Sequence, residues 1–143
     1  MIHTEIQDYA NRFTSLQNEL LEELTQKTYS ERADKNMLSG FYQGRVLSMI
    51  SQIVTPRRIL EIGTYMGFSA LCLAEGLTDD GKIITLDMQP ETHKIAKEFI
   101  SRSEFEGKID ARLGDATKII PTLDETFDLV FIDADKPNYA NYF

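Results

Sequence analysis

The sequence contains no tryptophan, two histidines and one cysteine among its 143 residues. A single cysteine, Cys72, excludes an intramolecular disulfide, and so little cysteine and histidine leaves no zinc-binding pattern. Cys72 lies in the apolar run 70–74 without a basic neighbour, so we expect a buried thiol of low reactivity. Neither histidine belongs to a Ser-His-Asp or Cys-His arrangement that would indicate nucleophilic catalysis.

Basic residues are also scarce. The chain has 15 lysines and arginines against 23 aspartates and glutamates, which gives a net charge of -8 and a pI of about 4.7. Nucleic acids and anionic membranes bind basic surfaces, so we expect neither as a partner. The sequence has no apolar run of membrane-spanning length, and its N-terminus lacks the basic start and apolar core of a signal peptide. We therefore expect a cytoplasmic protein.

The first part of the chain has the period of an amphipathic helix. Its apolar residues recur at steps of three and four: Ile6, Tyr9, Phe13, Leu16, Leu20 and Leu24. We expect this stripe to pack on the core or on a partner subunit, and a polar loop to follow over 28–35. Residues 1–35 are thus interpreted as an N-terminal helix and loop, and 36–143 as the main domain.

A second helix is predicted from about Gly40 to Val54, ended by Pro56. Its inward-facing residues are predicted to be Val46, Leu47, Ile50, Ile53 and Val54.

Beyond Pro56, predicted strands alternate with predicted helices. The strands are expected at 59–62, 82–87, 109–113 and 127–132, and the helices at about 69–77, 91–103 and 116–123. This alternation predicts right-handed crossovers and a parallel α/β sheet with flanking helices. The apolar runs of the first, second and fourth strands favour burial on both faces of the sheet.

Four candidate features follow strands, where ligands bind to open parallel sheets: 61–67, Asp87, 114–115 and 133–136. The first turn contains Gly63 and Gly67, but Tyr65 stands where a dinucleotide-binding turn needs its second glycine. This favours a nucleotide-like cofactor without a pyrophosphate. The alternative is that the two glycines only form a turn between strand and helix.

Asp87 lies at the end of a predicted strand, where a carboxylate can accept hydrogen bonds from a ribose diol. It could instead be a solvated aspartate that caps the following helix. Asp115 could accept a hydrogen bond from an adenine amino group, or cap the helix that begins near Ala116, or do both.

Asp133 and Asp135 alternate just past the fourth predicted strand and suit a hard divalent cation with oxygen ligands. Beside such a cation the charged form of Lys136 is disfavoured, which suits it to act as a general base. The alternative is an ordinary solvated loop.

Together these segments resemble the cation-dependent O-methyltransferases that use S-adenosylmethionine, such as catechol and caffeoyl-CoA O-methyltransferases, and above all bacterial relatives of the latter. Residues 60–70 resemble the cofactor loop of that family and 131–139 its metal-site segment, within a similarity over 36–143. The resemblance implies a Rossmann-like methyltransferase fold whose sheet is incomplete after the fourth strand.

The resemblance also implies roles for individual residues. Gly63 and Thr64 would contact the methionine part of the cofactor, and Glu61 and Ser69 would line that site. The remaining implied contacts are Asp87 to the ribose, Ala116 to the adenine, Ser39 to the cofactor and Met37 to the acceptor.

Asp133 would be the first metal ligand and Lys136 the general base, again by resemblance. The implied cation is magnesium, or calcium or manganese in its place. It would bind two neighbouring hydroxyls of a small acceptor, expected to be an aromatic diol, and lower the pKa of one. The resulting oxyanion would attack the sulfonium methyl.

In the family an Asp-Asn pair after a further strand completes the metal site, and this sequence ends at Phe143 before it. We therefore expect an N-terminal part of a methyltransferase, with weakened cofactor binding, poor turnover and an exposed strand edge. The N-terminal helix suggests a homodimer. Two other functions stay open: a nicotinamide-dependent oxidoreductase, which Tyr65 disfavours, and a non-catalytic cofactor-binding or assembly module.

Overall fold

The computed structural model describes residues 4–142, which form a four-stranded parallel sheet in the order β3-β2-β1-β4. The strands are β1 (Arg58–Ile62), β2 (Lys82–Asp87), β3 (Ile109–Leu113) and β4 (Leu129–Ile132). In register, Leu60 of β1 lies between Ile84 of β2 and Val130 of β4. The predicted parallel sheet is confirmed. Because strand order reverses between β1 and β4, a ligand site is expected beyond their carboxyl ends.

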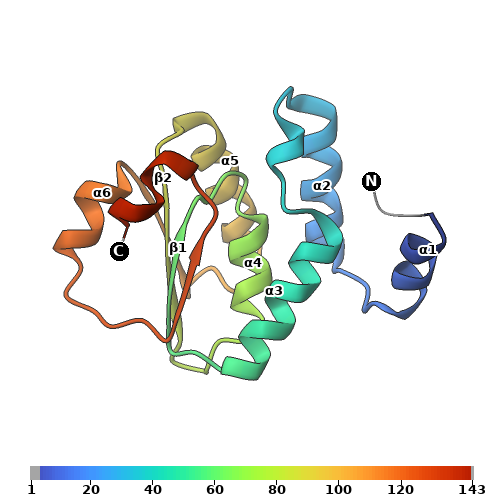
Figure 1. Ribbon diagram of the computed structural model, residues 1–143, viewed down its shortest axis with the longest axis horizontal. Helices are drawn as coiled ribbons and strands as arrows, with labels where there is room; N and C mark the ends of the chain where they lie inside the picture. The colour runs from blue at the N-terminus through green and yellow to red at the C-terminus, as the bar shows by residue number, and fades with distance from the viewer. Residues whose placement is uncertain (1–3, 143) are drawn as a thin grey trace.

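Helices cover the two faces of the sheet unequally. They are α1 (Thr4–Phe13), α2 (Glu19–Glu31), α3 (Gly40–Val54), α4 (Phe68–Ala74), α5 (Pro90–Ser101) and α6 (Ala116–Ile119), with short 3-10 helices at Lys35–Met37, Ile120–Thr122 and Lys136–Asn141. Figure 1 shows α3 and α4 on one side of the sheet and α6 on the other. No helix among residues 4–142 is long and apolar enough to cross a bilayer.

Alternate residues of the strands point to opposite faces of the sheet and pack into two separate hydrophobic cores, as the two-residue period of a strand requires. Ile59 and Ile83 pack with buried residues of α2, α3, α4 and α5, including Leu24 and Phe99. Leu60, Ile62, Ile84 and Leu86 face the other way and pack against Ala116. The larger core lies between the sheet and these four helices.

The N-terminal helix is interrupted, contrary to the single stripe that the sequence predicts. Asn18 caps α2 by accepting the Leu21 N–H at 2.9 Å, and a side-chain acceptor at this position favours a new helix start. Helix α2 then continues to Glu31, so the predicted loop over 28–35 is wrong in its first half. Thr28 is fully buried and donates to the Leu24 carbonyl at 2.7 Å.

The bounds predicted for α3 are confirmed, but its buried face is not the one predicted. Leu47 is buried as expected, whereas Val46, Ile50, Ile53 and Val54 are exposed. Small residues face α4 instead, because the two helices pack very closely. A Cβ on Gly44 would lie 2.6 Å from the Phe68 ring and 2.9 Å from Cys72 Sγ.

Cys72 is buried between these two helices, as predicted. Burial raises the pKa of its thiol to about 12, although Arg45 nearby favours the thiolate. The expectation of low reactivity follows from this raised pKa.

Strand β4 is less buried than its apolar sequence predicts. It lies at an edge of the described sheet and pairs with β1, and Val130 is 48% exposed. The prediction of two covered faces is therefore wrong for this strand, although β1 and β2 are buried. Burial of a parallel strand depends on its place in the sheet as well as on its composition.

Candidate functional site

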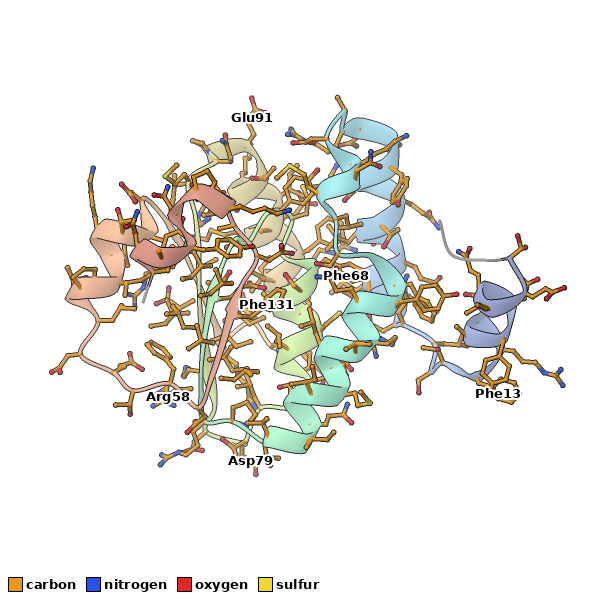
Figure 2. All side chains as sticks on the ribbon, viewed as in Figure 1. Phe13, Arg58, Phe68, Asp79, Glu91 and Phe131 are labelled. Carbon is orange, nitrogen blue, oxygen red and sulfur yellow. The ribbon has the colours of Figure 1, made fainter. Side chains whose placement is uncertain are left out.

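A cavity of about 650 Å³ lies beyond the carboxyl ends of the strands. Figure 2 shows this end of the sheet on the side of Glu91, and Arg58 and Asp79 at the opposite end. Eight of the predicted site residues line the cavity: Met37, Ser39, Gly63, Thr64, Ser69, Asp87, Ala116 and Asp133. The other three, Glu61, Asp115 and Lys136, are not part of its lining. The tertiary structure thus brings together residues from separate segments of the chain.

The turn after β1 depends on a close approach of two backbones. Gly63 has φ +106°, and a Cβ there would lie 2.2 Å from the Asp133 carbonyl oxygen. Its N–H donates to the Leu86 carbonyl at 2.9 Å. Glycine at this position therefore lets the loop after β4 lie directly against the turn, and this places Asp133 beside it.

Asp87 is held in place by backbone donors on both sides. Its Oδ2 accepts the Tyr65 N–H at 2.6 Å, and its Oδ1 accepts the Gln89 N–H at 2.8 Å. A carboxylate has about four acceptor sites, so each oxygen keeps capacity for a ligand donor. The N-cap position of α5 belongs to Gln89, which makes no side-chain cap bond. Asp87 is thus a preoriented acceptor in the cavity wall.

Glu61 lies beneath the cavity and is fully buried. Its Oε2 accepts the Thr85 hydroxyl at 2.5 Å, and the Thr85 and Thr64 hydroxyls are also 2.5 Å apart. Its Oε1 has no partner among the described residues. Burial raises the pKa of Glu61 to about 7 against the lowering effect of Ser69 and Thr85, and the charges of Asp133 and Asp87 raise it further.

Sequence reasoning missed Thr85, which connects this carboxyl group to the turn. The signal was present, because Thr85 is the polar residue within an otherwise apolar stretch of β2 and pairs in register with Glu61. Two facing polar positions in buried strands indicate a hydrogen bond between them.

The segment before α3 contributes a further wall of the cavity. Ser39 precedes α3 and makes no side-chain cap bond, so its hydroxyl is available to a ligand. Met37 is 64% exposed, whereas Leu38 is buried and anchors the segment. Ser39 and Met37 both line the cavity, and their contacts with a cofactor and an acceptor stay a prediction.

Asp115 caps α6, which is one of its two predicted roles. Its Oδ1 accepts the Thr117 N–H at 3.0 Å and the Thr117 hydroxyl at 2.6 Å. The neighbouring Ala116 is buried and lines the cavity. A contact of Asp115 with an adenine stays a prediction.

The loop after β4 supplies two carboxylates to the cavity lining, Asp133 and Asp135. Asp133 lines the cavity, and Gln43 Nε2 lies 3.5 Å from its Oδ2. Asp135 accepts from Tyr142 and Asn138, each at 2.5 Å, and these bonds lower its pKa.

Lys136 is exposed at the start of the last 3-10 helix. Within residues 4–142 no group of three or more His, Cys, Asp or Glu side chains could hold a metal ion. The described residues therefore do not form a cation site by themselves.

Comparisons with known proteins point in one direction. The O-methyltransferase family profile matches residues 11–143. A catechol O-methyltransferase of Niastella koreensis is 38% identical over 105 residues, which are 71% of this chain and 48% of the relative. A caffeoyl-CoA O-methyltransferase of Petroselinum crispum is 38% identical over 112 residues, 74% of this chain and 46% of the relative. The chain spans about half the length of these curated relatives.

Solved structures agree with these relatives. The SAH-bound methyltransferase PaMTH1 of Podospora anserina superposes with a TM-score of 0.90 at 30% identity, covering 97% of this chain and 60% of that one. An O-methyltransferase from Bacillus cereus in complex with SAH gives 0.81 at 32% identity, covering 94% and 62%. The Rossmann-like methyltransferase fold is thus confirmed.

Proposed function

This chain belongs to the O-methyltransferase family, and we propose that its cavity binds S-adenosylmethionine as the donor of a methyl group to a hydroxyl of a small acceptor. The observation that carries this proposal is Asp87, preoriented in the cavity wall beside the turn of Gly63 and Thr64. The two similar structures that hold SAH support the choice of cofactor.

Bound S-adenosylmethionine supplies an electrophilic methyl group, and the residues of this chain bind and orient it. Gly63 and Thr64 would contact its methionine part together with Ser69, with Glu61 beneath them. Asp87 would accept hydrogen bonds from the ribose hydroxyls. The adenine would lie by Ala116, with Asp115 as a candidate acceptor, and Ser39 would also contact the cofactor.

The acceptor side is inferred from the family. Met37 and Asp133 would contact a catechol-like or other aromatic diol, in keeping with the names of the two curated relatives. Asp133 would be one ligand of a divalent cation, magnesium or else calcium or manganese, and such an ion needs ligands besides those described here. Lys136 would act as the general base. A cytoplasmic location stays a prediction from the sequence.

Replacing Asp87 by alanine is expected to weaken binding of S-adenosylhomocysteine at least tenfold. Two hydrogen bonds to a charged carboxylate are lost, and each tenfold corresponds to about 1.4 kcal/mol. Isothermal titration calorimetry of both proteins measures the change. Asp110→Ala is the matched control, because Asp110 is exposed near the start of β3 and pairs with Arg112 at 2.8 Å. Equal affinity of folded Asp87→Ala and wild-type protein would contradict the cofactor assignment, and titration with NADH would then test an oxidoreductase.

We also propose that the chain forms a homodimer through the exposed apolar surface of α1 and α3. The exposed residues are Ile6, Tyr9, Phe13, Val46, Met49, Ile50, Ile53 and Val54. Helix α1 lies beside the first turn of α3, where the Tyr42 hydroxyl donates to the Gln7 carbonyl at 3.0 Å. An apolar surface of this kind on two neighbouring helices is typical of a subunit interface.

A charge within this surface is expected to separate the subunits. Ile53 is 75% exposed, so Ile53→Asp should leave the monomer folded while placing an unpaired carboxylate in the interface. Light scattering coupled to gel filtration should show wild-type dimers and mutant monomers. Gln26→Asp, on an exposed position of α2, should stay dimeric. A wild-type protein that is monomeric at tens of micromolar would contradict the proposal.

A further inference from the structure

The segment that precedes α3 is tied to the rest of the chain by an ion pair and a tyrosine. Arg32 donates to both carboxylate oxygens of Asp34, from Nε and from a terminal nitrogen, at 2.8 Å each. A third contact of Arg32 reaches Glu91 on α5 at 3.3 Å. The carboxylate of Asp34 is thereby fixed in orientation. Arg32 lowers the pKa of Asp34 to about 2, with Tyr65 contributing, so this carboxylate is charged at neutral pH.

Tyr65 reaches the same carboxylate from the cofactor turn. Its hydroxyl donates to Asp34 Oδ1 at 2.9 Å, and its own N–H donates to Asp87 Oδ2 at 2.6 Å. The residue has φ +46°, a left-handed conformation that is uncommon for a bulky side chain. A single residue therefore connects Asp34 in one wall of the cavity with Asp87 in another.

We propose that Asp34, held by Arg32, is a positioning residue for the cofactor site, because its bond to Tyr65 ties the wall formed by 34–39 to the turn that orients Asp87. The inference rests on the proposed cofactor for its effect on binding. The Asp34–Tyr65 bond itself exists independently of any ligand.

Two further observations support this role. Asp34, Tyr65 and Asp87 all line the cavity, so the bond lies in its wall and not at a remote surface. The backbone that follows Asp34 is held by short local bonds, from Met37 N–H to the Asp34 carbonyl at 2.9 Å and from Leu38 N–H to the Lys35 carbonyl at 3.1 Å. A single 3-10 turn has poor intrinsic stability, so its order depends on tertiary anchors. Asp34 at its start and buried Leu38 at its end supply them.

The first test needs no cofactor. Hydrogen exchange of the Met37 and Leu38 amides in the free protein should accelerate several-fold in Tyr65→Phe and in Asp34→Asn. Both variants keep side-chain shape and remove or weaken the same bond. Tyr29→Phe is the matched control, because Tyr29 is an exposed tyrosine of α2. Unchanged exchange in both variants, with wild-type thermal stability, would overturn the proposal.

The second test measures the affinity for S-adenosylhomocysteine in a double-mutant cycle. Each single variant should bind about tenfold more weakly, and the double variant no more weakly than either single one, because both act on the same charge-assisted bond, which Tyr65→Phe removes and Asp34→Asn weakens. Fully additive effects, or affinities equal to that of wild type, would overturn the positioning role. Failure of the wild-type protein to bind S-adenosylhomocysteine would count against the proposed function. The hydrogen-exchange result would still show whether the Asp34–Tyr65 bond orders the segment 34–39.

Discussion

Replacing Gly63 by alanine is expected to lower the free energy of unfolding by about 3 kcal/mol or more and to abolish binding of S-adenosylhomocysteine. Two effects combine at this position. The φ of +106° is unfavourable for any residue with a side chain, and the new Cβ would lie 2.2 Å from the Asp133 carbonyl oxygen and 2.7 Å from its carbonyl carbon. Backbone atoms cannot yield as a flexible side chain does, so the turn or the loop after β4 must move.

Two other glycines separate these effects. Gly40 has φ +73°, and a Cβ added there would meet no atom within 4 Å, so Gly40→Ala should show the backbone strain alone, about 1 kcal/mol. Gly107 has neither a positive φ nor a close neighbour, so Gly107→Ala should be nearly neutral. Urea unfolding followed by circular dichroism measures the free energy of unfolding of all three variants. If Gly63→Ala costs no more than Gly40→Ala, the contact with Asp133 is not what requires glycine.

The second large effect is a dependence of stability on pH that comes from Glu61. Its pKa is raised from 4.5 to about 7 in the folded protein, chiefly by burial. In the unfolded chain the group loses its proton near the ordinary value. Its contribution to stability is therefore fully present below about pH 4.5 and is lost as pH rises to about 7. The loss is on the order of 3 kcal/mol, since each unit of pKa difference corresponds to about 1.4 kcal/mol.

Comparison with Glu61→Gln isolates this contribution, because glutamine has the same shape and does not titrate. Between pH 5 and 7.5 the unfolding free energy of wild type should fall relative to that of the variant. The subtraction cancels the contributions of carboxylates such as Asp128, whose pKa is lowered by backbone N–H groups of Arg58 and Arg57. For the control Glu106→Gln, at an exposed position, the unfolding free energy should change with pH as it does in wild type. Parallel curves for Glu61→Gln as well would contradict the raised pKa.

The strands and the place of the site could be predicted from the sequence, because both depend on local patterns. The strands predicted at 59–62, 82–87 and 109–113 match β1, β2 and β3 closely. Because ligands bind beyond the carboxyl ends of parallel strands, Gly63, Asp87 and Asp133 were predicted to lie in one site. All three line the same cavity. The resemblance to cation-dependent O-methyltransferases rested on the residues of the same loops, and the family membership confirms it.

The exposed and buried faces of the N-terminal helices could not be predicted in this way. The apolar pattern of α3 predicted that Ile53 and Val54 are buried. In the structure its buried face includes Gly44 and Ser51, because their small size lets the backbones of α3 and α4 approach closely. Helix packing distance is a property of both partners, and a single helix sequence does not contain it.

The sequence by itself predicted a parallel α/β sheet, a resemblance to methyltransferases, and acidic residues at or just past the ends of three strands, namely Asp87, Asp115 and Asp133. The tertiary structure alone decided that Glu61 lies beneath the cavity on Thr85, and that Tyr65 connects Asp34 with Asp87. Short-range periodicity specifies which segments become strands and helices. Burial of a carboxylate and the partners of a hydrogen bond depend on segments that are distant in sequence and meet only when the chain has folded.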